Sequence, residues 1–294
     1  MRIRIGTRGS TLALIQSELV AGLLRAAGHD AQLVPIVTEG DLRPPGMAAG
    51  EGVFVAAIAR SLLAGEIDAA VHSAKDVPLA EEHDLVIACY PQRADPRDAL
   101  ITRAGGQSLS TIEERATVGT DSPRRTGFLR AARPDLRVVA LHGNVDTRLQ
   151  KLDGGVVDAL VIAAAGVDRL GQGGRIDERL EPDLVAPAPG QGALAVQARR
   201  SDHELLEILR SIDAHDIRAA VETEREVLHA TGGTCRAPVG ALASMTSDSF
   251  SLLVAGVNSD GSGKRAWRVE GRRAEARAVA AQAGRRLVAE VALR

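Results

Sequence analysis

Short apolar runs alternate with helical repeats of apolar residues along much of the chain. The runs predict strands, and the repeats predict helices. The predicted strands are residues 2–7, 31–37, 68–73, 116–120, 136–141 and 158–164. The predicted helices are residues 9–28, 53–64, 122–132 and 144–153. Strands that alternate with helices indicate a mostly parallel α/β sheet, and because the pattern restarts after residues 95–100, we expect two α/β domains of similar build.

The first predicted helix carries its own start and stop signals. Ser10 or Thr11 is the expected N-cap, because a hydroxyl can accept a hydrogen bond from the first turn, and Gly28 is the expected end. The stripe expected to face the core is Leu12, Ile15, Leu19 and Leu23.

The pattern changes near residue 215. A long helix is predicted over residues 216–230, and strands and a final helix follow at 237–243, 250–257, 265–271 and 274–290, with a hairpin turn at 259–264. This tail predicts a smaller α+β domain. Residues 187–200 form a loop that enters a strand, which we expect to return to the first domain. The predicted domains are residues 1–93 with 193–212, residues 94–192, and residues 213–294.

Composition narrows the function classes. The chain has 294 residues, of which 45% are hydrophobic, 25% charged and only 2% aromatic, with a net charge of −2. Few aromatic residues and a negative charge argue against a nucleic-acid partner. Cys89 and Cys235 are too few for a disulfide framework or a zinc site, and no metal is expected. No apolar stretch approaches the roughly 20 residues of a membrane span, and no export signal is visible, so we expect no membrane partner and a cytoplasmic location.

Cations follow the predicted strands, at the edge of the sheet where ligands of open α/β sheets bind. They are Arg8, Lys75, Arg124 with Arg125, Arg148 and Arg169. Taken singly, each of these side chains is common at the start of a helix or on a helix face that is exposed to solvent. Taken together, they predict a cleft for a small polyanion, since arginine binds carboxylate or phosphate through two hydrogen bonds. Neither a Walker-type loop nor a GxGxxG helix start occurs, so nucleotides are not favoured over polycarboxylates.

Two further residues of the segment VHSAKD have competing interpretations. Asp76 is either an ion-pair partner of Lys75 or a group that stabilises a cationic intermediate or moves a proton. His72 is expected to be a core histidine, because no second histidine or cysteine stands at metal-ligand spacing.

The segment TGGTCRAPVGA places Cys235 among small residues and directly before Arg236. One interpretation is a helix end followed by a turn, with Cys235 as a small hydrophobic residue. The other is an accessible thiolate, assisted by Arg236, that acts as a nucleophile or an attachment point. The loop alone leaves both open.

Seven motifs in this order resemble the porphobilinogen deaminase (hydroxymethylbilane synthase) family. They are RIGTRGSTLAL, VHSAKDVP, DPRDAL, VGTDSPRR, GNVDTRLQKL, PAPGQGALAVQAR and GGTCRAPVG. The resemblance implies two α/β domains like those of type II periplasmic binding proteins plus a smaller α+β C-terminal domain. It implies a transferase that condenses porphobilinogen, a polycarboxylate pyrrole, head-to-tail with loss of ammonia to give the linear tetrapyrrole hydroxymethylbilane. The dipyrromethane cofactor would be joined to Cys235 by a thioether, and the enzyme would be a monomer.

The resemblance also implies a role for individual residues. Asp76 would be catalytic, stabilising positive charge near the pyrrole nitrogens. The residues expected to hold the cofactor are Lys75, Asp76, Thr120, Ser122, Arg124, Arg125, Arg148, Gly192 and, covalently, Cys235. The residues expected to bind substrate are Arg8, Ser10, Phe54, Arg148, Arg169 and Gln191.

Three positions depart from the family pattern. His142 stands where the family usually has the arginine of RGNV, and Asp121 stands in place of the first serine of VGTSS. The segment from Met47 to Gly52, which includes Glu51, lacks both lysines of the usual loop. Lost charge-assisted hydrogen bonds predict slower elongation.

Three alternatives remain beside the main interpretation. The first is a diverged relative that makes a shorter or different pyrrole product. The second is a non-catalytic protein that binds small anions, which Cys235 and the lack of an export signal disfavour. The third is a thiolate acyltransferase with His229 as its base, which no further triad signal accompanies.

Overall fold

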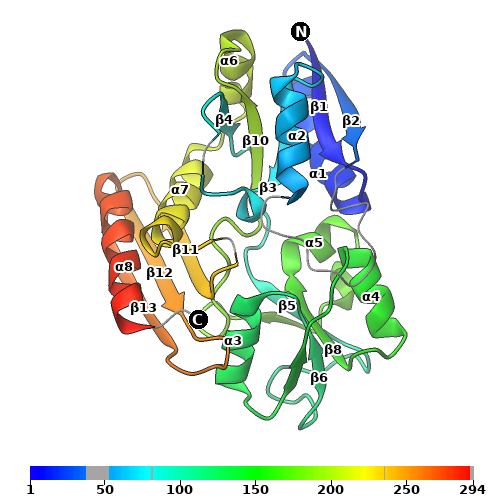
Figure 1. The fold of residues 1–294 in the computed structure, drawn as a ribbon, viewed down its shortest axis with the longest axis vertical. Coiled ribbons are helices and arrows are strands. Elements are labelled where there is room, and N and C mark those ends of the chain that lie inside the picture. Colours follow the sequence, from blue (N-terminus) through cyan, green and yellow to red (C-terminus); the bar gives the residue numbers. More distant parts are fainter. Residues whose placement is uncertain (38–52, 81, 235, 292–294) are drawn as a thin grey trace. The chain divides into compact units, whose positions relative to one another are not determined.

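The computed structural model describes residues 1–37, 53–80, 82–234 and 236–291. The chain divides into two compact units (Figure 1). The first is Met1–Ala94 with Ala193–Arg218, and the second is Asp95–Gly192 with Ala219–Arg294. The predicted division into three domains stays a prediction; in the structure, the C-terminal residues belong to the second unit.

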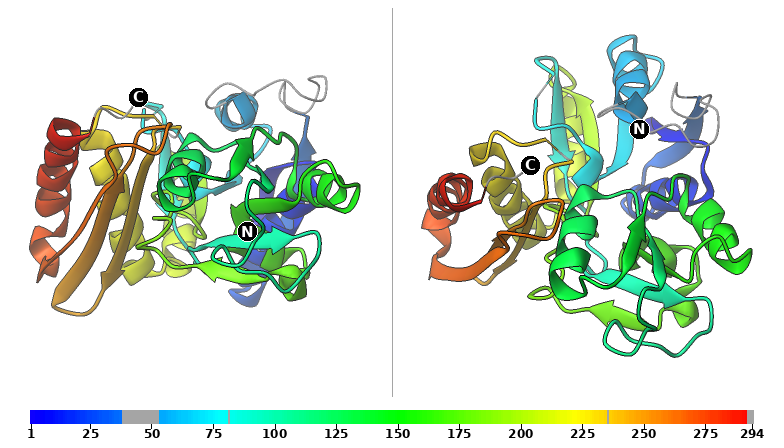
Figure 2. Two further views of the ribbon diagram at one scale, coloured as in Figure 1. Left: turned by 90° about the horizontal axis from the view of Figure 1, so that it is seen from below. Right: turned by 60° about the horizontal axis from the view of Figure 1, so that its bottom comes forward.

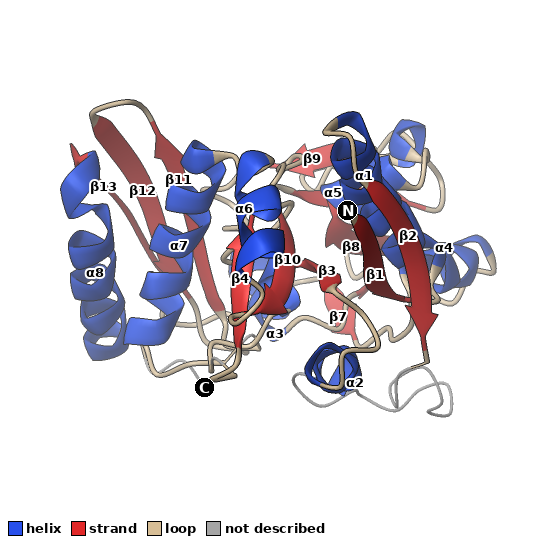
Figure 3. Ribbon diagram, turned by 90° about the horizontal axis from the view of Figure 1, so that it is seen from above, coloured by secondary structure: helices blue, strands red, loops and turns tan. Residues whose placement is uncertain are grey.

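The first unit is built on a mixed five-stranded sheet of order β2-β1-β3-β10-β4. Its strands are β1 (Arg2–Arg8), β2 (Asp30–Ile36), β3 (Ala69–Ser73), β4 (Leu85–Cys89) and β10 (Leu194–Arg199). Its helices are α1 (Thr11–Ala26), α2 (Val53–Leu63), the 3-10 turn η1 (Ala74–Asp76), α6 (His203–Ser211) and the start of α7 (His215–Ala230). β1 runs parallel to β2 and β3, whereas β10 is antiparallel to both β3 and β4. The predicted return of the chain to the first sheet is therefore confirmed, and α6 packs along β4 and β10 (Figure 3).

The second unit contains another five-stranded sheet, of order β7-β6-β8-β5-β9, and a three-stranded antiparallel sheet. The first of these has strands β5 (Asp98–Thr102), β6 (Thr117–Gly119), β7 (Arg137–Val139), β8 (Ala159–Ala163) and β9 (Glu178–Leu180). Its helices are α3 (Pro123–Ala132), α4 (Val145–Asp153), α5 (Ala164–Arg169) and the 3-10 turn η2 (Gly173–Arg175). The three-stranded sheet consists of β11 (Val239–Met245), β12 (Ser249–Gly256) and β13 (Arg265–Arg272), followed by η3 (Arg273–Glu275) and α8 (Ala276–Glu290).

The sheets confirm the predicted fold class of two α/β parts and a smaller α+β part. α8 packs on β12 and β13 (Figure 2), as a helix must cover one face of an antiparallel sheet to bury it. The pattern missed β4, β5, β9, α5 and α6. β5 and β9 pair antiparallel in the second sheet, where an α/β alternation does not predict them.

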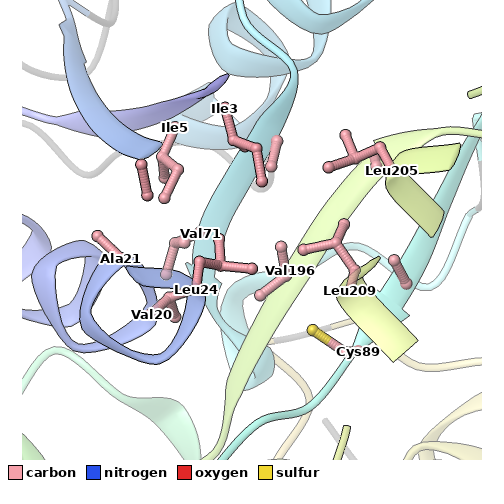
Figure 4. Packing of buried hydrophobic residues seen from close by; sticks show 14 of the residues in the cluster. Ile3, Ile5, Val20, Ala21, Leu24, Val71, Cys89, Val196, Leu205 and Leu209 are labelled. Carbon is pink, nitrogen blue, oxygen red and sulfur yellow. The ribbon is translucent and has the colours of Figure 1, made fainter. Parts of the chain in front are cut away.

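The buried face of α1 differs from the predicted stripe. Leu19 and Leu23 are 39% and 37% exposed, whereas Val20, Ala21 and Leu24 are fully buried. These three pack in the apolar cluster of the first unit (Figure 4). The predicted stripe is wrong at Leu19 and Leu23, whereas Leu12 and Ile15 are half-buried. Two adjacent rows of α1 have helical spacing, and packing against the sheet selected the other row.

Both serines at the starts of helices act as caps. The Oγ of Ser10 accepts a hydrogen bond from the N–H of Ala13, 3.4 Å away, which confirms Ser10 as the first N-cap. The Oγ of Ser122 accepts from the N–H of Arg125, also at 3.4 Å, and Pro123 opens α3. Each hydroxyl keeps its own hydrogen for another acceptor.

His72 is a core histidine, as predicted. Its side chain lies on β3 and is only 6% exposed. Burial lowers the pKa of His72 from 6.5 to about 4, because the charged imidazolium loses its hydration, although Gln197 opposes the change. The ring is therefore neutral in the folded protein near neutral pH.

This burial predicts a dependence of stability on pH. The unfolded chain takes up a proton at His72 near pH 6.5, whereas the folded chain does so only near 4, so stability is lost as the pH falls between these values. The loss should approach about 1.4 kcal/mol per pH unit. Urea unfolding of the wild type and of His72→Gln across this range should show a flatter profile for the variant. Parallel profiles would contradict the assignment.

Candidate active site

The first unit brings four predicted site residues to one edge of its sheet. β1 and β3 are parallel neighbours, with Gly6 paired to Ala70, so the residues that follow both strands lie at the same edge. Arg8 ends β1, and Ser10 caps α1 beside it. Lys75 and Asp76 lie in η1, directly after β3, with Lys75 half-buried and Asp76 exposed.

The second unit repeats this arrangement. β7, β6 and β8 are parallel, so the segments that follow them also share an edge. Thr120 follows β6, is buried, and donates its N–H to the carbonyl of Val139 at 3.0 Å. Arg148 lies half-buried in α4 beyond β7, and Arg169 ends α5 beyond β8.

The two arginines of α3 share a buried carboxylate. Asp98, on β5, is completely buried, while Arg124 and Arg125 are 3% and 5% exposed. Nη1 of Arg124 donates to Asp98 at 2.8 Å and also to the carbonyl of Ala186. Nε of Arg125 donates to the other carboxylate oxygen at 2.9 Å. The two arginines of the motif VGTDSPRR are thus held by a strand of the same unit.

The charges of Asp98, Arg124 and Arg125 do not sum to zero. Burial raises the pKa of the Asp98 carboxyl, but Arg124 and Arg125 outweigh burial and hold the pKa well below its usual range. Asp98 is therefore ionised, and it faces two guanidinium groups. Among the described residues, no second carboxylate pairs with Arg124 or Arg125. One positive charge in excess remains in a region with little access to water.

The loop Gly190–Gln191–Gly192 is hydrogen-bonded to Asp98 and Arg125. Gln191 is completely buried, and its Nε2 donates to Asp98 at 2.9 Å while its Oε1 accepts from Arg125 at 3.3 Å. Gly190 and Gly192 have φ values of 77° and 85°, a left-handed conformation that favours glycine. Hydrogen bonds therefore fix the path of the loop on the side of β5 and α3.

Glu224 and Arg169 hold the two glycines of this loop. The carboxylate of Glu224, a completely buried residue of α7, accepts the N–H of Gly190 at 2.7 Å and that of Ala243 at 2.8 Å. Nη2 of Arg169 donates to the carbonyl of Gly192 at 2.8 Å, and burial lowers the pKa of Arg169. Arg169 therefore already supports the loop, in addition to any role toward a ligand.

Sequence reasoning missed Asp98 and Glu224. Each carried a signal, because a carboxylate stands where the pattern expects an apolar residue. Asp98 opens the apolar run DALIT, and Glu224 lies on the buried face of α7 with Val221 and Leu228. A charge in such a position usually has a buried partner.

Some predicted site features lie outside the described residues. These are Cys235, the segment from Met47 to Gly52, and the side chain of Phe54. Two of the departures, His142 and Asp121, are described and lie within hydrogen-bonding distance of each other, 2.9 Å between Nδ1 and Oδ1.

Comparison with known proteins identifies the family. The family model described as "Porphobilinogen deaminase, dipyromethane cofactor binding domain" matches residues 3–207. The chain belongs to the porphobilinogen deaminase family. It is 47% identical to the porphobilinogen deaminase of Acidothermus cellulolyticus over 266 residues, which cover 88% of this chain and 80% of that protein. It is 48% identical to that of Cutibacterium acnes, with 83% and 77% covered.

The resemblance of the seven motifs is thus confirmed, and so is the dipyrromethane cofactor-binding domain. The relatives are enzymes of tetrapyrrole synthesis. Among solved structures, the chain is similar to the second substrate binding domain of a putative amino acid ABC transporter from Streptococcus pneumoniae. The TM-score is 0.47 and the identity 14%, over 72% of this chain and 91% of that one, a likeness too low to carry an argument about function. In the described part of the chain, no helix has the length and apolarity that crossing a membrane requires.

The buried group predicts a strong effect of Asp98→Asn. The amide keeps the shape but leaves two buried guanidinium groups without a counter-charge, so the free energy of unfolding should fall by about 3–5 kcal/mol. The matched control is Asp153→Asn, since Asp153 is 57% exposed where it pairs with Arg175. The control should change stability by about 1 kcal/mol or less. Equal effects of the two substitutions in denaturant unfolding would contradict this account.

Proposed function

We propose that this chain condenses porphobilinogen head-to-tail on a dipyrromethane primer held by a thioether to Cys235, and releases hydroxymethylbilane. Each condensation joins a free pyrrole α-carbon, which loses its proton, to the aminomethyl carbon of the next substrate, whose carbon–nitrogen bond breaks so that the nitrogen leaves as ammonia. Water then cleaves the carbon–carbon bond between the tetrapyrrole and the primer, which gives the product its hydroxyl group and returns a hydrogen to the primer. The chemistry that the primer supplies when bound is a free pyrrole α-carbon.

The observation that carries this proposal is the excess of positive charge at Arg124 and Arg125. A buried charge needs a partner, and Asp98 supplies only one for two guanidinium groups. Carboxylates on a bound pyrrole chain would supply the balance. Each guanidinium has five N–H donors, and the contacts within the described residues leave Nη1 of Arg125 for a ligand. The donor set therefore fits a polycarboxylate group such as the dipyrromethane.

The neighbouring residues suit the same ligand. Ser122 caps α3 with its oxygen and keeps its O–H for a carboxylate. We assign cofactor binding to Ser122 with Thr120, Lys75, Arg148 and Gly192. We assign the incoming pyrrole to Arg8, Ser10, Phe54, Arg148, Arg169 and Gln191.

Asp76 is proposed as the catalytic residue. Its carboxylate is exposed at the end of β3 and beside Lys75, so it can approach a bound ring without a large desolvation penalty. A fixed negative charge there stabilises positive charge that develops at the pyrrole nitrogens. We further propose that the enzyme works as a monomer in the cytoplasm, with no nucleic-acid partner.

Cofactor attachment can be tested by the intact mass of the purified protein. The wild type should carry the mass of a dipyrrole, and Cys235→Ala should lose it while remaining folded. Cys89→Ala is the matched control and should keep the added mass, because Cys89 is buried in the apolar cluster of the first unit and burial raises the pKa of its thiol. An unmodified wild-type mass, or an added mass on Cys235→Ala, would refute the attachment site.

The role of Asp76 can be tested with Asp76→Asn. The amide keeps the size of the side chain but removes its charge, so the protein should keep its cofactor and lose about 100-fold in kcat. Asp84→Asn, an exposed carboxylate of the same unit, should keep the wild-type rate. Near wild-type turnover by Asp76→Asn would leave Asp76 as an ion-pair partner of Lys75.

The length of the product can be tested by mass spectrometry of the wild-type reaction. The mass of the product distinguishes a tetrapyrrole from a shorter pyrrole chain.

A further inference from the structure

Asp121 connects two segments of the second unit that are far apart in sequence. It lies in the loop between β6 and α3, and its Oδ1 is 2.9 Å from Nδ1 of His142, which follows β7. Its Oδ2 is 3.9 Å from Nη1 of Arg236. Nη2 of Arg236 also donates to the main-chain carbonyl of Asp121, at 3.4 Å. Asp121 therefore uses both carboxylate oxygens and its carbonyl on these two partners.

The backbone on both sides of this cluster is also held. The carbonyl of His142 accepts from Nζ of Lys151, on α4, at 2.9 Å. The N–H of Arg236 donates to Oγ1 of Thr234 at 3.2 Å. The side chains of Asp121 and His142 are 20% and 26% exposed, whereas that of Arg236 is 44% exposed. An ion pair as exposed as that of Asp121 with Arg236 adds little to the free energy of unfolding. We therefore expect it to act by fixing where the backbone at Arg236 lies.

The direction of the Asp121 carboxylate also matters for the anion site. Asp121 directly precedes Ser122, so an unpaired negative charge here would repel the carboxylates assigned to this loop. The carboxylate faces His142 and Arg236 instead, and the guanidinium of Arg236 offsets part of its charge.

We propose that Asp121 is a positioning residue, which holds Arg236, and with it the chain that leads out of Cys235, against the loop between β6 and α3. This inference rests on the proposed function, because Asp121, His142 and Arg236 can assist cofactor attachment only if the cofactor is attached to Cys235. It also makes the two departures a pair. Asp121 and His142 replace a serine and an arginine of the family pattern, and here they bind each other. The Asp121 carboxylate faces His142 with Oδ1, so its Oδ2 can pair with Arg236.

The test is the rate of cofactor attachment to the full chain, produced in cells that make no porphobilinogen. The purified chain is mixed with porphobilinogen, and its mass is followed over time. Asp121→Ala and Arg236→Ala should each attach the cofactor more slowly, by up to about fivefold, as the loss of an exposed ion pair implies. The double variant should be no slower than Arg236→Ala alone, because Arg236→Ala already removes the side-chain contact that Asp121→Ala removes, together with the hydrogen bond to the carbonyl of Asp121. Asp153→Asn, an exposed carboxylate of the same unit, should react at the wild-type rate.

The outcomes separate this inference from the proposed function. If the wild type gains the mass and Asp121→Ala gains it equally fast, the positioning role is wrong and the proposed function stands. Slowing that is multiplicative in the double variant would also overturn the role, since the two residues would then act independently. If the wild type gains no mass at all, the proposed function and the inference both fail. Should Asp121→Ala unfold, Asp121→Asn keeps the side-chain shape, removes only the charge, and should be slower than the wild type.

Discussion

The charge–charge contact of Asp98 with Arg124 and Arg125 is the interaction on which the second unit's candidate site depends. A carboxylate and two guanidinium groups out of water are each unfavourable alone, and their mutual attraction offsets the lost hydration only in a fixed geometry. That geometry joins β5, α3 and the loop around Gln191, three segments distant in sequence. The loop is further held by Glu224 from α7. A ligand that meets α3 therefore meets a surface whose orientation is already set.

The charge left over from this contact bears on the ligand that we propose for the site. The chain as a whole is slightly acidic, with a net charge of −2, yet cations collect where strands end. Long-range attraction to a large polyanion is thus weak, whereas the donors of the proposed site would act on a small polycarboxylate at short range. Asp121 fits this balance, because its negative charge is directed to His142 and Arg236.

The site residues also have structural tasks, which explains why they occur in continuous motifs. Ser10 and Ser122 cap helices, Arg169 supports the carbonyl of Gly192, and Thr120 is buried in the sheet edge. Parallel strands end at one edge of a sheet, so a short motif after each strand supplies the turn, the cap and a residue of the proposed site together. Substitutions in these motifs will therefore change stability as well as binding, and the two must be measured separately.

The sequence by itself determined the alternation of strands and helices, a hydroxyl cap at Ser10 or Thr11, the burial of His72 and the family. These follow from local spacing, local hydrogen bonds and continuous motifs, all of which the linear chain contains. Tertiary structure alone decided which row of α1 is buried, because two rows have the same period and only the sheet distinguishes Val20 from Leu19. It alone paired Asp98 with the arginines of α3, Glu224 with Gly190, and Asp121 with His142. A buried or shielded charge is stabilised by a partner distant in sequence, and the linear pattern shows that a partner is required without showing which residue it is.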